Sequence, residues 1–216
     1  ILSGAVQYIS CRMLDSIIDL YDLLLDKFGP QHWWPAETEF EVIVGALLTQ
    51  QTRWESVERA IINLKQQSLL TPTSLARAER GVIEECIRCT GFYRQKAERL
   101  QLLSQYFSKN GISRILVKPV SELRKELLSL KGVGPETADS IILYAAHKPV
   151  FVIDAYTTRI CNCIGVDGGY DVLQRYFEDL LPESVPLYQE FHALIVVYGK
   201  EYCVRKRCDE CIISTV

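Results

Sequence analysis

Apolar residues recur at helical spacing along most of the chain. In the segment 53–67 they follow one another at intervals of three or four, so one face of a helix would carry Trp54, Val57, Ile61 and Leu64. The same periodicity predicts further helices at residues 13–27, 39–50, 74–78, 82–88, 94–107, 121–130, 135–146, 155–164, 171–180 and 187–200. The one strand-like run, KPVFVI at 148–153, is short, so the pattern predicts an all-α fold.

The composition is that of an ordinary soluble globular protein, with 48% hydrophobic and 24% charged residues in 216. No apolar run approaches the roughly 20 residues that span a bilayer, and the apolar start carries no basic leader. We therefore expect an intracellular protein without a membrane partner. The net charge of −3 gives no general basic signature, so any binding of nucleic acid must depend on local patches.

The stretch LKGVGPETADS reverses the chain between two amphipathic helices. The turn consists of four residues, Lys131, Gly132, Val133 and Gly134. Glycine supplies the φ values and the missing Cβ that so tight a turn requires, and Pro135 suits the first position of the next helix. The turn is either an ordinary connection between helices or a phosphate site, formed by its amides at the positive end of the second helix dipole.

Four segments, in the same order along the chain, resemble the endonuclease III superfamily of DNA glycosylases. LKGVGPETA followed by VIDAY is similar to the family's helix-hairpin-helix and Gly/Pro-Asp signature. ALLTQQT resembles the end of a family helix that carries a glutamine. TGFYRQKAERL resembles the family segment G-F/Y-x-x-K-A-x-x-L, and GKEYCVRKRCDEC resembles the family's iron–sulfur loop. The resemblance spans residues 30–211. WWPAETEFEVIVGALLTQQTRWESV is most similar to the endonuclease III-type 3-methyladenine glycosylases.

The resemblance implies two helical lobes with DNA between them. A six-helix lobe at residues 36–148 would end in the hairpin, and residues 1–35 with 149–216 would form the second lobe, including the cysteine loop. The implied partner is double-stranded DNA containing a damaged base, bound by a monomer in the cytoplasm at the nucleoid. The damaged base would be flipped into the cleft, because its bond to the sugar is not accessible within the stacked duplex.

Asp154 matches the family's catalytic aspartate. Cleavage of an N-glycosidic bond develops positive charge on the sugar, so an anion beside C1′ stabilises the transition state and can align a water. The position of Asp154 directly before AYTTRI also suits a helix N-cap, and the two roles are compatible.

Glu136 occupies the position at which bifunctional relatives carry a Schiff-base lysine. A carboxylate cannot form an imine, and Lys131 lies before the hairpin. The resemblance therefore implies a glycosylase without strong lyase activity, in which water is the nucleophile. Glu136 is either a first-turn acid favoured by the helix dipole or a second acidic group of the pocket.

Aromatic and polar residues are the candidates for contacts with the base and the DNA. Alkylated purines favour stacking on aromatic faces, which fits Trp33, Trp34, Pro35 and Trp54, although Trp54 also lies on the apolar face of its helix. Gln50 matches the family's wedge glutamine, and Gln51 is a candidate reader of the opposite strand. The remaining implied DNA contacts are the turn residues 131–134, Tyr156 and Lys96.

The C-terminal cysteines resemble an iron–sulfur loop that is one ligand short. Cys203-x4-Cys208-x2-Cys211 has the family's final C-x2-C spacing, but the first gap is shorter than the usual six. A further C-x5-C step would fall at 217, beyond the sequence given, and Cys11 is an alternative fourth ligand. The pattern predicts either a 4Fe–4S cluster on these three cysteines and one more, or a loop without a cluster.

The leading interpretation is monofunctional removal of an alkylated purine such as 3-methyladenine. The nearest enzymatic alternative is a mismatch glycosylase acting on thymine or adenine, because such relatives also lack the lysine. A helix-hairpin-helix DNA-binding module without catalysis is the alternative of another class, and the presence of Asp154 argues against it.

Overall fold

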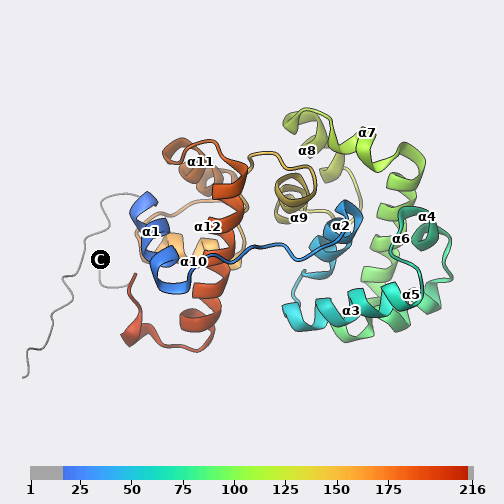
Figure 1. Cartoon of the computed structure of the whole chain (residues 1–216), viewed down its shortest axis with the longest axis horizontal. Coiled ribbons are helices and arrows are strands. Elements are labelled where there is room, and N and C mark those ends of the chain that lie inside the picture. The colour runs from blue at the N-terminus through green and yellow to red at the C-terminus, as the bar shows by residue number, and fades with distance from the viewer. Residues whose placement is uncertain (1–16, 214–216) are drawn as a thin grey trace, which may run out of the picture.

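The protein is built from short helices, as the computed structural model shows for residues 17–213 (Figure 1). The α-helices are α1 (Ile17–Phe28), α2 (Glu39–Leu48), α3 (Trp54–Gln66), α4 (Pro72–Arg77), α5 (Arg80–Ile87), α6 (Tyr93–Asn110), α7 (Ile112–Leu116), α8 (Val120–Leu128), α9 (Pro135–Ser140), α10 (Ala155–Cys163), α11 (Tyr170–Leu180) and α12 (Val185–Tyr198). No strand occurs within this described range, which confirms the all-α prediction. Every helix in it is too short or too polar to span a bilayer.

Two predicted helices change their winding before they end. The hairpin helix begins at Pro135 as α9 and continues as a π-helical turn, η2 (Ile141–Ala145), and α12 continues in the same way as η3 (Gly199–Val204). Short 3-10 turns, η1 (Arg88–Thr90) and η4 (Cys208–Glu210), complete the described elements. α7 is a five-residue helix that periodicity did not predict, because so short a segment contains barely one repeat.

The helices form two groups. In Figure 1, α2 to α9 lie together at the right, while α1, α10, α11 and α12 lie at the left, and the connection after α1 crosses between the groups. α2 and α12 carry buried residues almost continuously along their length, including Ile43 and Leu47 on α2 and Leu194 and Ile195 on α12. A helix that is buried along most of its length belongs in a core, so α2 and α12 each contribute to the core of their group.

The strand-like run KPVFVI is extended but pairs with no sheet among the described residues. Both backbone groups of Phe151 pair with side chains of α11 instead: the Phe151 amide donates to Glu178 Oε1 at 2.9 Å, and Gln174 Nε2 donates to the Phe151 carbonyl at 2.7 Å. The Phe151 ring stacks on Phe177 with centroids 4.1 Å apart. Buried backbone groups must be paired, and α11 pairs them here without a strand.

A buried carboxylate ties the two groups of helices together. Asp139 on α9 is fully buried, and its oxygens accept from Arg124 Nε on α8 at 2.8 Å and Arg124 Nη2 at 3.2 Å. Gln174 Nε2 on α11 also donates to Asp139, at 2.8 Å. Because Gln174 also holds the Phe151 carbonyl, this cluster links the hairpin helix to the segment that leads to Asp154.

Replacing Asp139 by Asn should destabilise the fold strongly. The substitution removes the buried charge that pairs with the Arg124 guanidinium and leaves only the exposed Asp171, a change that costs about 3–5 kcal/mol. Urea unfolding measures the loss. Asp171→Asn is the matched control, because Asp171 is exposed and contacts the same guanidinium at 3.4 Å, so its loss should cost below about 1 kcal/mol. Equal stability of the two variants would contradict the conclusion that the buried Asp139 carboxylate stabilises the fold.

Candidate active site

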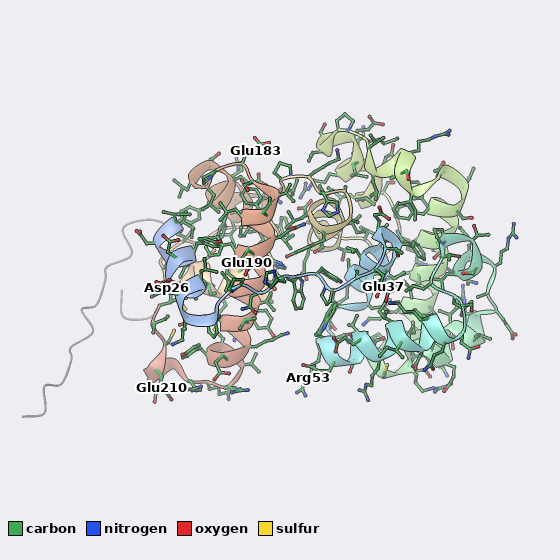
Figure 2. The ribbon with its side chains drawn as sticks, viewed as in Figure 1. Asp26, Glu37, Arg53, Glu183, Glu190 and Glu210 are labelled. Atoms are coloured by element: carbon green, nitrogen blue, oxygen red, sulfur yellow. The ribbon has the colours of Figure 1, made fainter. Side chains whose placement is uncertain are left out.

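A cleft of about 880 Å³ lies between the two groups of helices. Its walls come from the linker before α2, the connection between α2 and α3, the first part of α9, the start of α10, and the α12–η3 helix. The sequence candidates that line it are Trp33, Trp34, Gln51, Trp54, Glu136, Asp154 and Tyr156. In Figure 2, Arg53, another lining residue, lies at the lower edge of the right-hand group of helices.

Asp154 is the N-cap of α10, as its sequence position predicts. Its Oδ1 accepts from the Thr157 amide at 2.7 Å and from Thr157 Oγ1 at 2.9 Å. These bonds fix the carboxylate at the N-terminus of the helix. Oδ2 takes part in neither bond and lies 3.8 Å from His192 Nε2.

Glu136 lies in the first turn of α9 and lines the same cleft. The residue is exposed at the cleft, and nearby protein atoms partly desolvate its carboxylate. Desolvation, together with the smaller effect of the negative charge of Asp154, raises the pKa of Glu136 to about 7. Glu136 is therefore partly protonated at neutral pH, unlike a simple surface acid.

Sequence analysis missed His192, a cleft residue on α12. Its side chain is buried, its Nδ1 lies 2.7 Å from the Tyr144 hydroxyl, and its Nε2 has no hydrogen-bond partner among the described residues. The only sequence signal was a histidine on an otherwise apolar helix, and that pattern more often marks ordinary packing.

Three tryptophans form one cluster on the wall opposite α12. Trp33 and Trp54 lie with ring centroids 4.9 Å apart, Trp34 and Trp54 5.3 Å apart, and Trp34 also contacts the Tyr144 ring at 5.2 Å. Trp34 and Trp54 line a second hollow of about 310 Å³ as well, and Pro35 lines only that one. Pro35 thus lies beside Trp34 and Trp54 but does not line the cleft that holds Asp154, and its assignment to the base pocket stays a prediction.

The hairpin between α8 and α9 needs only one of its glycines for conformational reasons. Gly132 has φ +86°, and a Cβ there would lie 2.3 Å from Arg99 Cδ. Gly134 has an extended φ of −96° and open space around its Cα, so it does not supply the unusual φ value expected of it. The Val133 amide donates to the Leu130 carbonyl, whereas no backbone acceptor within residues 17–213 takes the amides of Gly132 and Gly134.

The two neighbouring glutamines have different surroundings. Gln50 Nε2 donates to the Gly132 carbonyl at 2.9 Å and to Thr137 Oγ1 at 3.0 Å, while Gln50 Oε1 accepts from Arg99 at 3.0 Å. Gln50 thus holds the hairpin in this structure. Gln51 is exposed, has φ +51°, and lines the cleft.

Lys96 is not a surface cation, contrary to the sequence prediction of a DNA contact. It is 2% exposed, and its ammonium donates to the Leu48 carbonyl at 2.8 Å, to the Thr90 carbonyl at 3.1 Å and to Thr52 Oγ1. Burial lowers the pKa of Lys96 to about 8. Its role in this structure is to join the end of α2 to the loop before α6. Lys131 is exposed and paired with Glu98 at 2.5 Å.

The loop before α6 presents another residue that sequence analysis did not select. Phe92 is 66% exposed and has φ +46°, an uncommon conformation for an aromatic residue. The loop is attached to the Gln51 segment, because Thr52 Oγ1 donates to the Thr90 carbonyl at 2.8 Å.

Comparison with known proteins identifies the family. The model of the HhH-GPD superfamily of base excision DNA repair proteins, the helix-hairpin-helix and Gly/Pro-Asp family, matches residues 44–183. The chain belongs to this superfamily. A Methanocaldococcus jannaschii protein named as a DNA repair glycosylase is 45% identical over 208 residues, covering 93% of this chain and 94% of that protein. Endonuclease III of Thermotoga maritima is 32% identical over 200 residues, covering 88% and 87%.

Solved structures show the same fold for this HhH-GPD glycosylase. The H. pylori 3-methyladenine DNA glycosylase MagIII, bound to 1,N6-ethenoadenine, superposes with a TM-score of 0.75 at 33% identity and covers 85% of this chain and 95% of that one. A trapped covalent complex of endonuclease III with DNA superposes with a TM-score of 0.73 at 22% identity, covering 88% and 89%. The chain is a DNA repair glycosylase of the superfamily.

The cysteine loop of the glycosylase does not form a four-thiolate site on the side chains described. Cys211 Sγ is buried and lies 2.8 Å from the Tyr198 hydroxyl, Cys203 lies in η3, and the side chain of Cys208 is outside the description. Cys11 also lies outside the described residues. Among those that are described, no three His, Cys, Asp or Glu residues are arranged to hold a metal. The predicted 4Fe–4S cluster stays a prediction.

The two hairpin glycines of the glycosylase should respond differently to alanine. Gly132→Ala forces a left-handed φ on alanine, at about 1–2 kcal/mol, and pushes its Cβ into Arg99. Gly134→Ala meets no atom within 4 Å. Urea unfolding should show a loss of about 1 kcal/mol or more for Gly132→Ala and a change within about 0.5 kcal/mol for Gly134→Ala. Similar losses for both would mean that the turn geometry is assigned wrongly.

Proposed function

We propose that the protein is a monofunctional DNA N-glycosylase that excises an alkylated purine from duplex DNA and leaves an abasic site. The observation that carries this proposal is the arrangement of the cleft. Asp154 is held at a helix N-terminus on one side, a tryptophan cluster forms another wall, and a carboxyl group stands at position 136 where an imine would require an amine.

The aromatic wall supports a damaged purine as the substrate. Alkylation makes a purine electron-poor or cationic, and such a ring gains more from stacking on an indole than from hydrogen bonds at its edge. Trp33, Trp34 and Trp54 all line the cleft, and a similar chain, that of MagIII, was solved with a modified adenine bound. The base would enter after rotation out of the duplex.

The reaction would use the two carboxyl groups in different roles. As the bond between C1′ and the base breaks, its electron pair leaves with the base and positive charge develops on the sugar. The Asp154 carboxylate stabilises that charge, because its Oδ1 is already fixed by Thr157. Water adds to C1′ and gives up a proton, which the ionised fraction of Glu136 can accept because the pKa of Glu136 is about 7.

Contacts with the duplex would come from the side of the cleft that carries the hairpin. The amides of Gly132 and Gly134 at the start of α9 suit one phosphate. Gln51 and Phe92 project from neighbouring loops, so they are the side chains we assign to the gap left by the flipped base. Tyr156 packs its ring against Gly199, where a Cβ would lie 2.3 Å from the ring, and it lines the cleft beside Asp154.

A panel of damaged duplexes tests the reaction and its substrate. We expect release of 3-methyladenine or 7-methylguanine, without release from duplexes with G·T, A·8-oxoguanine or thymine glycol. Asp154→Asn removes the anion beside the sugar and should slow base release about a hundredfold or more. Hot-alkali cleavage of end-labelled DNA measures the rate.

Asp179→Asn is the matched control for that panel, because Asp179 is exposed on α11, outside the lining of the cleft. Its rate should equal that of the wild type. Release of no base from any duplex would contradict the glycosylase proposal. Full activity in Asp154→Asn would contradict the assignment of Asp154, and release from G·T or A·8-oxoguanine alone would indicate a mismatch enzyme.

Borohydride trapping tests the proposal that water is the nucleophile. A Schiff base between protein and sugar is reduced to a permanent covalent adduct, and Glu136 has no amine with which to form one. We expect no adduct between wild-type protein and substrate DNA, and an adduct with Glu136→Lys, which places an amine in the cleft. Efficient trapping of the wild type, seen as a shifted band on a denaturing gel, would show that another amine attacks the sugar.

A further inference from the structure

His192 is a buried polar side chain whose hydrogen-bonding capacity is only partly satisfied by its surroundings. It lies on α12 with 6% of its surface exposed and lines the cleft, and its buried Nε2 has no hydrogen-bond partner among the described residues. Buried polar atoms are nearly always paired, because an unpaired one loses its hydration without compensation. An orphan nitrogen in a reaction cleft therefore indicates a contact made during the reaction.

The neighbouring tyrosine determines which ring nitrogen carries the proton. The Tyr144 hydroxyl can donate its one proton either to His192 Nδ1, at 2.7 Å, or to the Gln189 carbonyl, at 3.3 Å, and the shorter distance favours Nδ1. Burial raises the pKa of Tyr144 well above its usual range, so the hydroxyl keeps its proton and can donate it. Donation to Nδ1 leaves the proton of a neutral imidazole on Nε2. The orphan atom is then an N–H donor.

The acceptor nearest to this donor belongs to Asp154. Oδ2 of Asp154 lies 3.8 Å from Nε2, while Oδ1 is occupied by the two bonds from Thr157. We propose that His192, held as the Nε2-protonated tautomer by Tyr144, is a positioning residue that fixes Oδ2 of Asp154 toward the sugar. The inference rests on the proposed function of Asp154. Hydrogen bonds in substrate-free sites are often long and shorten when the substrate binds.

A neutral donor suits this task better than a charged one. An imidazolium would cancel much of the negative charge that Asp154 must present to the sugar, whereas an uncharged N–H orients the carboxylate and leaves its charge in place. Burial lowers the pKa of His192, while Asp154 opposes that shift, and the ring stays neutral at pH 7. The other titratable groups that line the cleft are Glu55, Glu136, Tyr156, Lys200 and Arg205, with Arg53 at its edge.

Two substitutions separate the two ring nitrogens. Asparagine places its amide where Nδ1 lies, so His192→Asn keeps a partner for Tyr144 but loses the donor toward Asp154. Glutamine places its amide nitrogen where Nε2 lies, so His192→Gln keeps the donor. We expect His192→Asn to lower the single-turnover rate of base release at pH 7 about ten- to a hundredfold, and His192→Gln to stay within about fivefold of the wild type.

The matched control is His147→Asn, the same replacement at an exposed histidine with φ +49°, a conformation that asparagine tolerates. Its rate should stay within about twofold of the wild type. Affinity for a duplex with a tetrahydrofuran abasic analogue should change less than about twofold in every variant. A fully active His192→Asn, a His192→Gln as slow as His192→Asn, or a loss of affinity parallel to the loss of rate would overturn the proposal.

Nitrogen-15 NMR of the histidine rings tests the inference without any activity. The chain has three histidines, and the His192→Gln spectrum assigns the signal of His192. We expect a neutral ring protonated at Nε2 at pH 7, and a lower pKa of His192 in Asp154→Asn, where the facing charge is removed. Protonation at Nδ1, or a charged ring at pH 7, would overturn the proposal for His192, whether or not the wild type releases a base. Failure of the wild type to release any base would instead refute the proposed glycosylase function.

Discussion

The buried carboxylate of Asp139 is the interaction on which the geometry of the cleft depends. It accepts from Arg124 and from Gln174, so it joins α8, α9 and α11 at one point. Glu136 lies one helical turn before Asp139, and Gln174 also holds the carbonyl of Phe151, three residues before Asp154. The two acidic groups of the cleft are thus fixed relative to each other through a single fully buried side chain.

Different kinds of contact fix the walls of the cleft. The hairpin wall is held by polar bonds, since Gln50 spans from the end of α2 to Gly132 and Thr137, and Arg99 supports Gln50. The aromatic wall is held by ring packing among three tryptophans and Tyr144. Tyr144 belongs to both systems, because its ring contacts Trp34 while its hydroxyl contacts His192. The tryptophan cluster and His192, which lies 3.8 Å from Asp154, are therefore structurally connected.

Sequence alone could predict the parts of this molecule that depend on local chemistry. Helical periodicity predicted most helices, and the N-cap position of Asp154 follows from an acidic residue before a helical segment. The sequence did not reveal the role of residues that depend on burial in the tertiary structure. A lysine in a charged segment gives no sign that the fold will bury it, so Lys96 was assigned to the surface. His192 was missed for the converse reason, since a histidine among the apolar residues of a buried helix gives no sign of its polar contact.

A glycine far from the chemistry sets how much room the cleft offers. Gly45, in the middle of α2, lies so close to the Trp34 indole that a Cβ would approach Cζ2 to 3.0 Å. The same indole separates the cleft of about 880 Å³ from the hollow of about 310 Å³. Any side chain at position 45 would push this partition toward one compartment or the other. A substitution inside α2 would therefore change the shape of both cavities through the Trp34 indole.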